Sequence, residues 1–113
     1  MAATFTSPTD PAIPAKGAPR LLVVDDLEDN RIIMTRRFQR RGFEVMEAEH
    51  GREALELIGA HHFDLILLDV VMPDMDGFEV LARIRETHSS ADLPVIMVSA
   101  KDGRLDIVHA LKL

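Results

Sequence analysis

Apolar residues follow two alternating patterns from residue 20 onward. Four short, largely apolar runs predict strands, and they span 21–24, 43–48, 65–68 and 95–98. After each run, apolar residues recur at helical spacing among charged neighbours. This spacing predicts helices over 27–41, over 51–60, after 77, and from 102 or 103 onward. The order βαβαβαβα predicts an α/β fold, a doubly wound parallel sheet with helices on both faces.

Each predicted helix carries apolar residues at helical spacing, and we expect these to face the sheet. Gly42 is placed to end the first helix. In chain order, the apolar residues of the helices are Leu27, Met34 and Phe38; Ala54, Leu55 and Ile58; Phe78, Leu81 and Ile84; and Leu105, Val108 and Leu111.

Residues 1–19 differ in composition from the rest of the chain. Ala, Thr and Pro dominate this stretch, which contains Pro8, Pro11, Pro14 and Pro19. A segment with so few large apolar groups cannot offset the entropy that it would lose on ordering. We therefore expect a flexible N-terminal tail over 1–19 and one folded domain over 20–113.

Composition excludes several classes of function. The chain contains no cysteine, which rules out disulfides, zinc–thiolate sites and thiol catalysis and is compatible with the cytoplasm, where we expect the protein to act. A formal net charge of −6 disfavours direct nucleic-acid binding. No apolar run approaches the roughly 20 residues that span a bilayer, so we expect no membrane segment. Neither GxGxxG nor a P-loop motif is present.

Polar side chains follow three of the predicted strands at the point where each strand ends. Asp25 and Asp26 follow the first strand, Asp69 the third and Ser99 the fourth. In a doubly wound sheet of strand order 2-1-3-4, these three strands are neighbours, and ligands bind at their carboxyl ends. We therefore expect these side chains to converge on one pocket.

Carboxylates brought this close repel one another, by roughly 1 to 4 kcal/mol for a pair at about 4 Å. Either one of them is protonated or a cation lies among them. Oxygen ligands without His or Cys suit Mg²⁺, which can bridge a carboxylate and an incoming phosphoryl group. A carboxylate can also accept a phosphoryl group covalently, and the hydroxyl of Ser99 could donate a hydrogen bond to it.

The chain resembles bacterial two-component response-regulator receiver domains of the chemotaxis-regulator type. The resemblance rests on three motifs in the family's order and spacing: Leu-Val-Val-Asp-Asp over 22–26, Leu-Leu-Asp-Val-Val-Met-Pro-Asp-Met-Asp-Gly over 67–77, and Ser99-Ala100. It covers residues 20–113 and implies the flavodoxin-like receiver fold.

The resemblance also implies a role for each of these residues. Asp69 matches the aspartate that a histidine kinase or a histidine phosphotransfer protein phosphorylates in the presence of Mg²⁺. Val71 and Lys101 match variable positions that tune the lifetime of the phosphoryl group, and we expect the apolar Val71 to make dephosphorylation slow. Asp26 matches the direct Mg²⁺ ligand, Asp25 a ligand through water, the backbone carbonyl of Val71 a further ligand, Ser99 the switch hydroxyl, and Pro73 and Gly77 the loop-shaping residues.

The sequence departs from the family at its end. Receiver domains continue with a fifth strand, a lysine that pairs with the phosphoryl group, and a fifth helix, whereas the sequence given ends at Leu113. Lys101 does not match that lysine. We expect a fragment of a longer protein that could carry an output domain. We also expect the fourth strand to form an uncovered edge, through which a homodimer could assemble.

Three functions compete at this point. The favoured one is a phosphoacceptor module that signals by conformational change and is not an enzyme acting on a separate substrate. An alternative is a non-phosphorylated dimerisation or docking module derived from a receiver. A third is an Mg²⁺-dependent phosphohydrolase, but that class typically has Asp-x-Asp around the nucleophile, whereas Asp69 is followed by Val70 and Val71.

Other conspicuous residues have simpler interpretations. The Arg36, Arg37, Arg40 and Arg41 cluster is interpreted as a solvated helix end, with a partner surface as the alternative. His61 and His62 are adjacent and point in different directions from a helix end, so a surface loop is favoured over a metal site. The methionines Met72, Met75 and Met97 are interpreted as loop packing and core.

Overall fold

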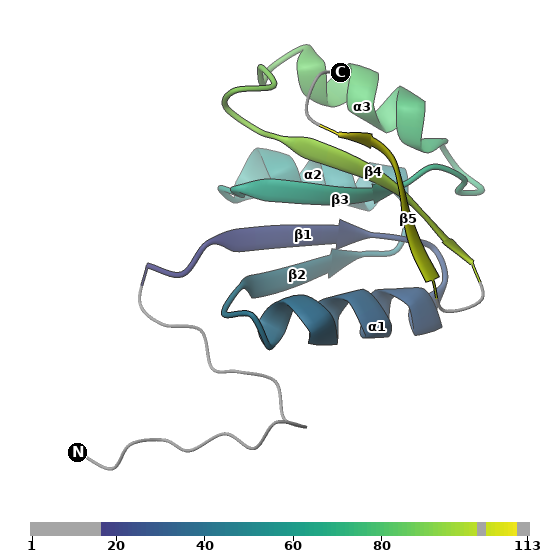
Figure 1. Ribbon diagram of the computed structural model, residues 1–113. Coiled ribbons are helices and arrows are strands. Elements are labelled where there is room, and N and C mark those ends of the chain that lie inside the picture. The colour runs from purple at the N-terminus through teal and green to yellow at the C-terminus, as the bar shows by residue number, and fades with distance from the viewer. Residues whose placement is uncertain (1–16, 102–103, 111–113) are drawn as a thin grey trace.

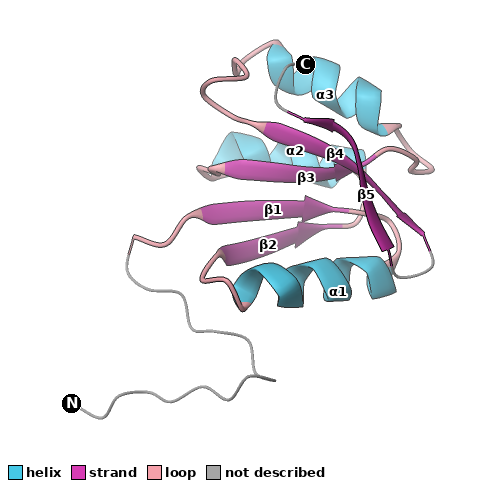
Figure 2. Ribbon diagram, in the orientation of Figure 1, coloured by secondary structure: helices cyan, strands magenta, loops and turns pink. Residues whose placement is uncertain are grey.

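The computed structural model describes residues 17–101 and 104–110, and these form one sheet with helices on both sides (Figure 1). The predicted tail therefore lies outside the described residues, except for 17–19. Figure 2 shows the alternation of strands and helices along the chain. The elements are β1 (Arg20–Val24), α1 (Glu28–Gln39), β2 (Glu44–Ala48), α2 (Gly51–Ala60), β3 (Leu65–Asp69), α3 (Gly77–Arg85), β4 (Val95–Lys101) and β5 (Arg104–Ala110).

The first four strands form the predicted parallel sheet. The strand order is β2-β1-β3-β4-β5, so the predicted order 2-1-3-4 is confirmed. In the parallel register, Val24 lies beside Leu68 and Asp69 beside Val98. The ends of β1, β3 and β4 therefore meet at one edge of the sheet, which is where the predicted site residues are located.

The prediction of a helix from 102 or 103 onward is wrong for the described residues. Residues 104–110 form β5, which pairs antiparallel with β4 from Lys101↔Arg104 to Ile96↔Ala110. The apolar spacing fits a helix, but a short apolar run of this kind does not distinguish a helix from a strand. Here the unpaired backbone groups of β4 decide the outcome, because a strand beside them satisfies their hydrogen bonds.

The expectation that β4 forms an uncovered edge is wrong for the same reason. In the described structure, β4 lies between β3 and β5 and is not an edge strand. The homodimer that was expected to form through an open β4 edge therefore loses its structural basis.

Alternate residues of the sheet pack into two separate cores, one on each face. Leu21 and Val23 of β1 face the α1 side and pack with Met34. Leu22 and Val24 face the other side, where α2 and α3 provide Ala54, Ile58, Val80, Leu81 and Ile84. In Figure 1, α2 lies behind the strands. Because β1 is buried on both faces, its end is held rigidly, and the acidic residues follow directly from it.

Two predicted inward residues are exposed instead. Phe78 is 44% exposed and Leu27 is 56% exposed. Asp76 caps α3 by accepting a hydrogen bond from the backbone N–H of Glu79 at 2.8 Å, so the helix begins at Gly77. The inward stripe is then Gly77, Val80, Leu81 and Ile84, all of which are buried. Leu27 precedes α1 as its N-cap residue and lies outside the helical stripe.

Among the described residues, no helix is both long and apolar enough to cross a membrane.

Candidate functional site

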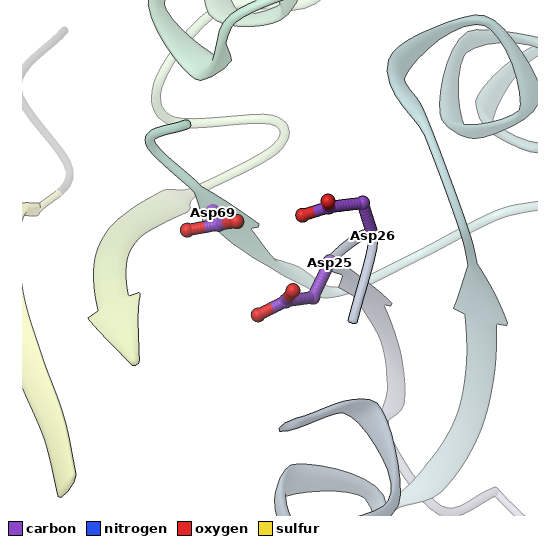
Figure 3. Close-up of side chains that lie close together, drawn as sticks. All are labelled: Asp25, Asp26 and Asp69. Carbon is purple, nitrogen blue, oxygen red and sulfur yellow. The ribbon is translucent and has the colours of Figure 1, made fainter. Parts of the chain in front are cut away.

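Three carboxylates meet at the carboxyl ends of β1 and β3 (Figure 3). Asp25 and Asp26 follow β1, and Asp69 is the last residue of β3. A carboxylate oxygen from each of them lies within 4.8 Å of the others. Within the described part of the chain, this is the one group of three or more acidic, His or Cys side chains close enough to hold a metal ion. The predicted convergence of these residues is therefore observed.

Asp25 is fixed from several directions and is 0% exposed. Its backbone N–H donates to the carbonyl of Ala48 at 3.2 Å, which ties the loop to the end of β2. Its Oδ1 accepts a hydrogen bond from the backbone N–H of Leu27 at 2.9 Å. Its Oδ2 is buried and has no hydrogen-bond partner among the described residues. A buried carboxylate oxygen without a partner is costly, so this atom calls for a cation or a proton.

The electrostatics of the site favour protonation of Asp69 when no cation is present. Burial raises the pKa of Asp69 to about 7, the charge of Asp25 adds to this effect, and that of Asp26 adds less. Backbone hydrogen bonds from Val71 and Val70 oppose the rise. Burial is also the main cause that raises the pKa of Asp25. The repulsion between the carboxylates that the sequence predicted is therefore present.

The donor set fits Mg²⁺. The three side chains offer oxygen atoms alone, and a hard divalent cation prefers such ligands. The unpartnered Oδ2 of Asp25 and the raised pKa of Asp69 both indicate excess negative charge, which a divalent cation relieves. Asp26, the remaining member, is partly exposed and leaves one side of the site open.

The other predicted site residues lie around this cluster. Val98 pairs with Asp69, so Ser99 is one residue further along the neighbouring strand. Val71 is 75% exposed, in the loop that follows Asp69. Gly77 packs so closely under this loop that an added Cβ would overlap the carbonyl oxygen of Asp69. The side chain of Lys101 lies outside the described part of the structure.

Sequence reasoning missed Arg31, whose side chain contacts the backbone of the loop that carries Asp25 and Asp26. Its guanidinium is almost fully buried and donates to the backbone carbonyl of Asp25 at 2.9 Å. It also lies 3.3 Å from the Oε1 of Glu47 and 3.5 Å from that of Glu49. The available signal was its position: Arg31, Met34 and Thr35 share the i, i+3, i+4 spacing of one helix face, and all three are buried.

The arginine cluster and the two adjacent histidines lie on the surface, as predicted. Arg36, Arg37, Arg40 and Arg41 are all exposed. His61 and His62 are exposed as well, and His62 lies 3.2 Å from Asp64. The buried Met72 and Met97 belong to the core, and Met75 packs against it.

The pKa of Asp69 predicts how stability depends on pH. Its value is about 7 in the folded state against an ordinary 3.8, so in this window the folded protein holds a proton that the unfolded chain has released. The free energy of unfolding of the metal-free protein should therefore fall by about 1 to 2 kcal/mol from roughly pH 5.5 to 7. Urea unfolding in EDTA, followed by circular dichroism, measures this. Asp69→Asn should flatten the pH profile of stability. A wild-type free energy of unfolding that rises over this range would contradict the raised pKa of Asp69.

The fold and the acidic cluster together define a receiver domain. The chain belongs to the response regulator receiver domain family, whose profile matches residues 21–113.

Relatives and solved structures place the chain within this family. It is 37% identical over 95 residues to the chemotaxis protein CheY1 of Helicobacter pylori, a match that covers 82% of this chain and 77% of CheY1. It is 42% identical over 93 residues to the probable transcriptional regulator ycf27 of Cyanidium caldarium, covering 82% and 36% of the two chains. The crystal structure of response regulator TrrA from Thermotoga maritima in complex with Mg²⁺-BeF has a TM-score of 0.68 and 36% identity, over 74% of this chain and 71% of that one.

The chain spans much less than the full length of several curated relatives. The matched region is 36% of ycf27 and 20% of the response regulator PleD of Caulobacter vibrioides. In these longer proteins the receiver is one part of the sequence.

Proposed function

We infer that this chain is a phosphoacceptor receiver module in which Asp69 accepts a phosphoryl group in the presence of Mg²⁺. The observation that carries this inference is the meeting of Asp25, Asp26 and Asp69 at one sheet edge, with excess negative charge at its centre. A carboxylate oxygen of Asp69 attacks phosphorus while the bond from phosphorus to the histidine nitrogen of the donor breaks, and the imidazole keeps the electron pair. With the second ring nitrogen of the phosphohistidine protonated, the products are an acyl phosphate and a neutral histidine.

Each side chain of the site has a distinct part in this proposal. Asp25, Asp26, Asp69 and the Val71 carbonyl would hold the Mg²⁺, which would neutralise the charge of the phosphoryl oxygens. Asp69 must be ionised to act as a nucleophile, and its pKa of about 7 leaves it partly protonated at neutral pH without a cation. Ser99, one residue beyond the strand partner of Asp69, donates its hydroxyl to a phosphoryl oxygen.

The phosphoryl donor in this proposal is a histidine kinase or a histidine phosphotransfer protein. Histidine kinase ThkA is named as the partner of TrrA in a solved complex, which resembles this chain with a TM-score of 0.67 and 36% identity over 73% of this chain and 69% of that one. Phosphorylation shifts the conformation of the loops around Asp69 and thereby the affinity for a further partner or an output domain. We place this activity in the cytoplasm, with residues 20–113 as the receiver.

The module is proposed to act on itself and not on an external substrate. Val70 and Val71 follow Asp69 where an Asp-nucleophile phosphohydrolase typically has Asp-x-Asp, and the exposed side chain of Val71 is apolar and positions an attacking water poorly. This supports slow loss of the phosphoryl group. The docking-module alternative is less favoured, because docking alone gives no reason to bury Asp25 with an unpartnered oxygen.

Intact mass spectrometry after incubation with acetyl phosphate tests the proposal. We expect one phosphoryl adduct with Mg²⁺, none in EDTA and none in Asp69→Asn. Asp92→Asn removes the same charge from an exposed carboxylate in the loop before β4 and should still be labelled. An adduct that persists in Asp69→Asn would overturn the assignment of the acceptor.

A further inference from the structure

The loop that follows Asp69 is tied to the start of a different helix by one carboxylate. Asp74 lies in the β3–α3 loop, and its Oδ1 accepts a hydrogen bond from the backbone N–H of Gly51 at 3.2 Å. Its Oδ2 accepts another from the backbone N–H of Arg52, also at 3.2 Å. Gly51 and Arg52 are the first two residues of α2, so Asp74 provides this helix with a cap from 23 residues away.

The remaining amides of this helix terminus have partners of their own. The backbone N–H of Glu53 donates to the Nδ1 of His50 at 3.2 Å, and that of Ala54 donates to the carbonyl of His50 at 3.1 Å. His50 accepts no hydrogen bond from the first two amides of the helix, and Asp74 accepts both. The two residues therefore cap different amides of α2. A carboxylate also suits the positive end of the helix dipole. Although desolvation by burial works against it, the hydrogen bonds from Gly51 and Arg52 leave the pKa of Asp74 below its ordinary value.

The contact surface between the loop and α2 leaves little freedom. A Cβ at Gly51 would lie 2.7 Å from Cγ2 of Val80 and 3.1 Å from Cβ of Met75, so the backbone at the start of α2 lies directly against this region. At the base of the loop, the backbone N–H of Gly77 donates to the carbonyl of Val70 at 2.8 Å. The middle of the loop is held by the buried Met72 on the apolar side and by Asp74 on the polar side.

The side chain of Val71 does little to fix the position of this residue in the loop. Its side chain is 75% exposed, so packing restrains it little, although its backbone contributes both a hydrogen bond to Asp69 and the proposed carbonyl ligand. The placement of that backbone depends on its neighbours in the loop. We propose that Asp74 is a positioning residue, which holds the β3–α3 loop against α2 so that the Val71 carbonyl and Asp69 face the same cation. The metal role of Val71 in this inference rests on the proposed function.

Asp74→Ala tests this inference through Mg²⁺ affinity and amide exchange together. We expect the Mg²⁺ dissociation constant, measured by calorimetry, to rise about tenfold, as happens when a group that orients metal ligands is lost. In ¹⁵N spectra, the amides of Gly51 and Arg52 should lose protection from hydrogen exchange. Asp74→Asn, which keeps one acceptor oxygen, should recover part of both effects.

Asp64 offers a matched control just before β3, at the end of the strands opposite to the site. Its carboxylate accepts a hydrogen bond from the backbone N–H of Arg20 at 2.8 Å, so Asp64→Ala removes the same charge and the same kind of bond. We expect Asp64→Ala to leave the Mg²⁺ dissociation constant within about twofold of wild type. The inference is overturned if Asp74→Ala also stays within that range while Gly51 and Arg52 lose protection, or if Asp64→Ala weakens Mg²⁺ binding equally. A wild-type protein that binds no Mg²⁺ contradicts the proposed function and with it the metal role of Asp74, whereas the exchange data still decide whether Asp74 holds the loop.

Discussion

Asp25→Asn should make the metal-free protein more stable while it weakens Mg²⁺ binding. Asp25 is fully buried beside Asp69, and its charge is one of the causes that raise the pKa of Asp69. In the variant, the amide oxygen can keep the hydrogen bond from the Leu27 N–H, and the NH₂ group can donate to the neighbouring carboxylates. We expect the free energy of unfolding in EDTA near neutral pH to rise by roughly 1 to 2 kcal/mol, because one of the repelling charges is gone.

The same substitution removes a charge that the cation needs. We expect the Mg²⁺ dissociation constant to rise about 10- to 100-fold, the range found for residues that orient or support metal ligands. Calorimetry gives the affinity, and urea unfolding by circular dichroism gives the stability, since the chain has no Trp or Tyr for fluorescence. The opposite signs of the two effects distinguish a functional carboxylate from a structural one. Asp92→Asn serves as the control and should change neither quantity appreciably. If Asp25→Asn lowers the stability of the metal-free protein, Asp25 is a structural residue and our interpretation of its burial is wrong.

Gly77→Ala should damage both the fold and the phosphoacceptor. An added Cβ would overlap the carbonyl oxygen of Asp69 and would lie 2.7 Å from Cε of Met97 and 3.0 Å from Cα of Val70. The methionine tip can move, but the backbone of Asp69 and Val70 can yield only if the loop is displaced. We expect the free energy of unfolding to fall by about 1 to 3 kcal/mol, the usual cost of overpacking. The rate of labelling by acetyl phosphate should fall as well, because Asp69 moves with its carbonyl.

Gly59→Ala is the matched control for this prediction. Gly59 is the second-last residue of α2, and a Cβ there meets nothing within 4 Å. Alanine favours a helix over glycine, so this variant should be more stable by about 0.5 to 1 kcal/mol and should be labelled at the wild-type rate. If both variants behave alike, the close approach of Gly77 to Asp69 has no functional consequence.

Local sequence patterns predicted most of the sheet and the centre of the site. Each parallel strand is a short apolar run, and Asp25, Asp26 and Asp69 lie at the ends of two of these runs. Because strand ends meet at one edge in a parallel sheet, the position of an acid in the sequence was enough to predict its neighbours in space. Burial on both faces fixes the strands strongly, which is why this part of the prediction held.

The features that were missed depend on partners distant in the sequence. Residues 104–110 fit a helix and a strand equally well, and the open side of β4 decided between them. Arg31 reaches Glu47, and Asp74 reaches the start of α2, and neither partner is visible from local spacing. Phe78 was assigned to the wrong face because the cap at Asp76 sets where the turns of α3 begin.

Direct location of the phosphoryl group tests the central claim. The protein is labelled with acetyl phosphate and Mg²⁺ and reduced with borohydride, which converts an aspartyl phosphate to homoserine, and the product is sequenced by tandem mass spectrometry. We predict homoserine at position 69, with Asp25 and Asp26 unchanged. Homoserine at position 25 or 26, or no conversion at all in protein shown to bind Mg²⁺, would contradict the assignment of Asp69 as the phosphoacceptor.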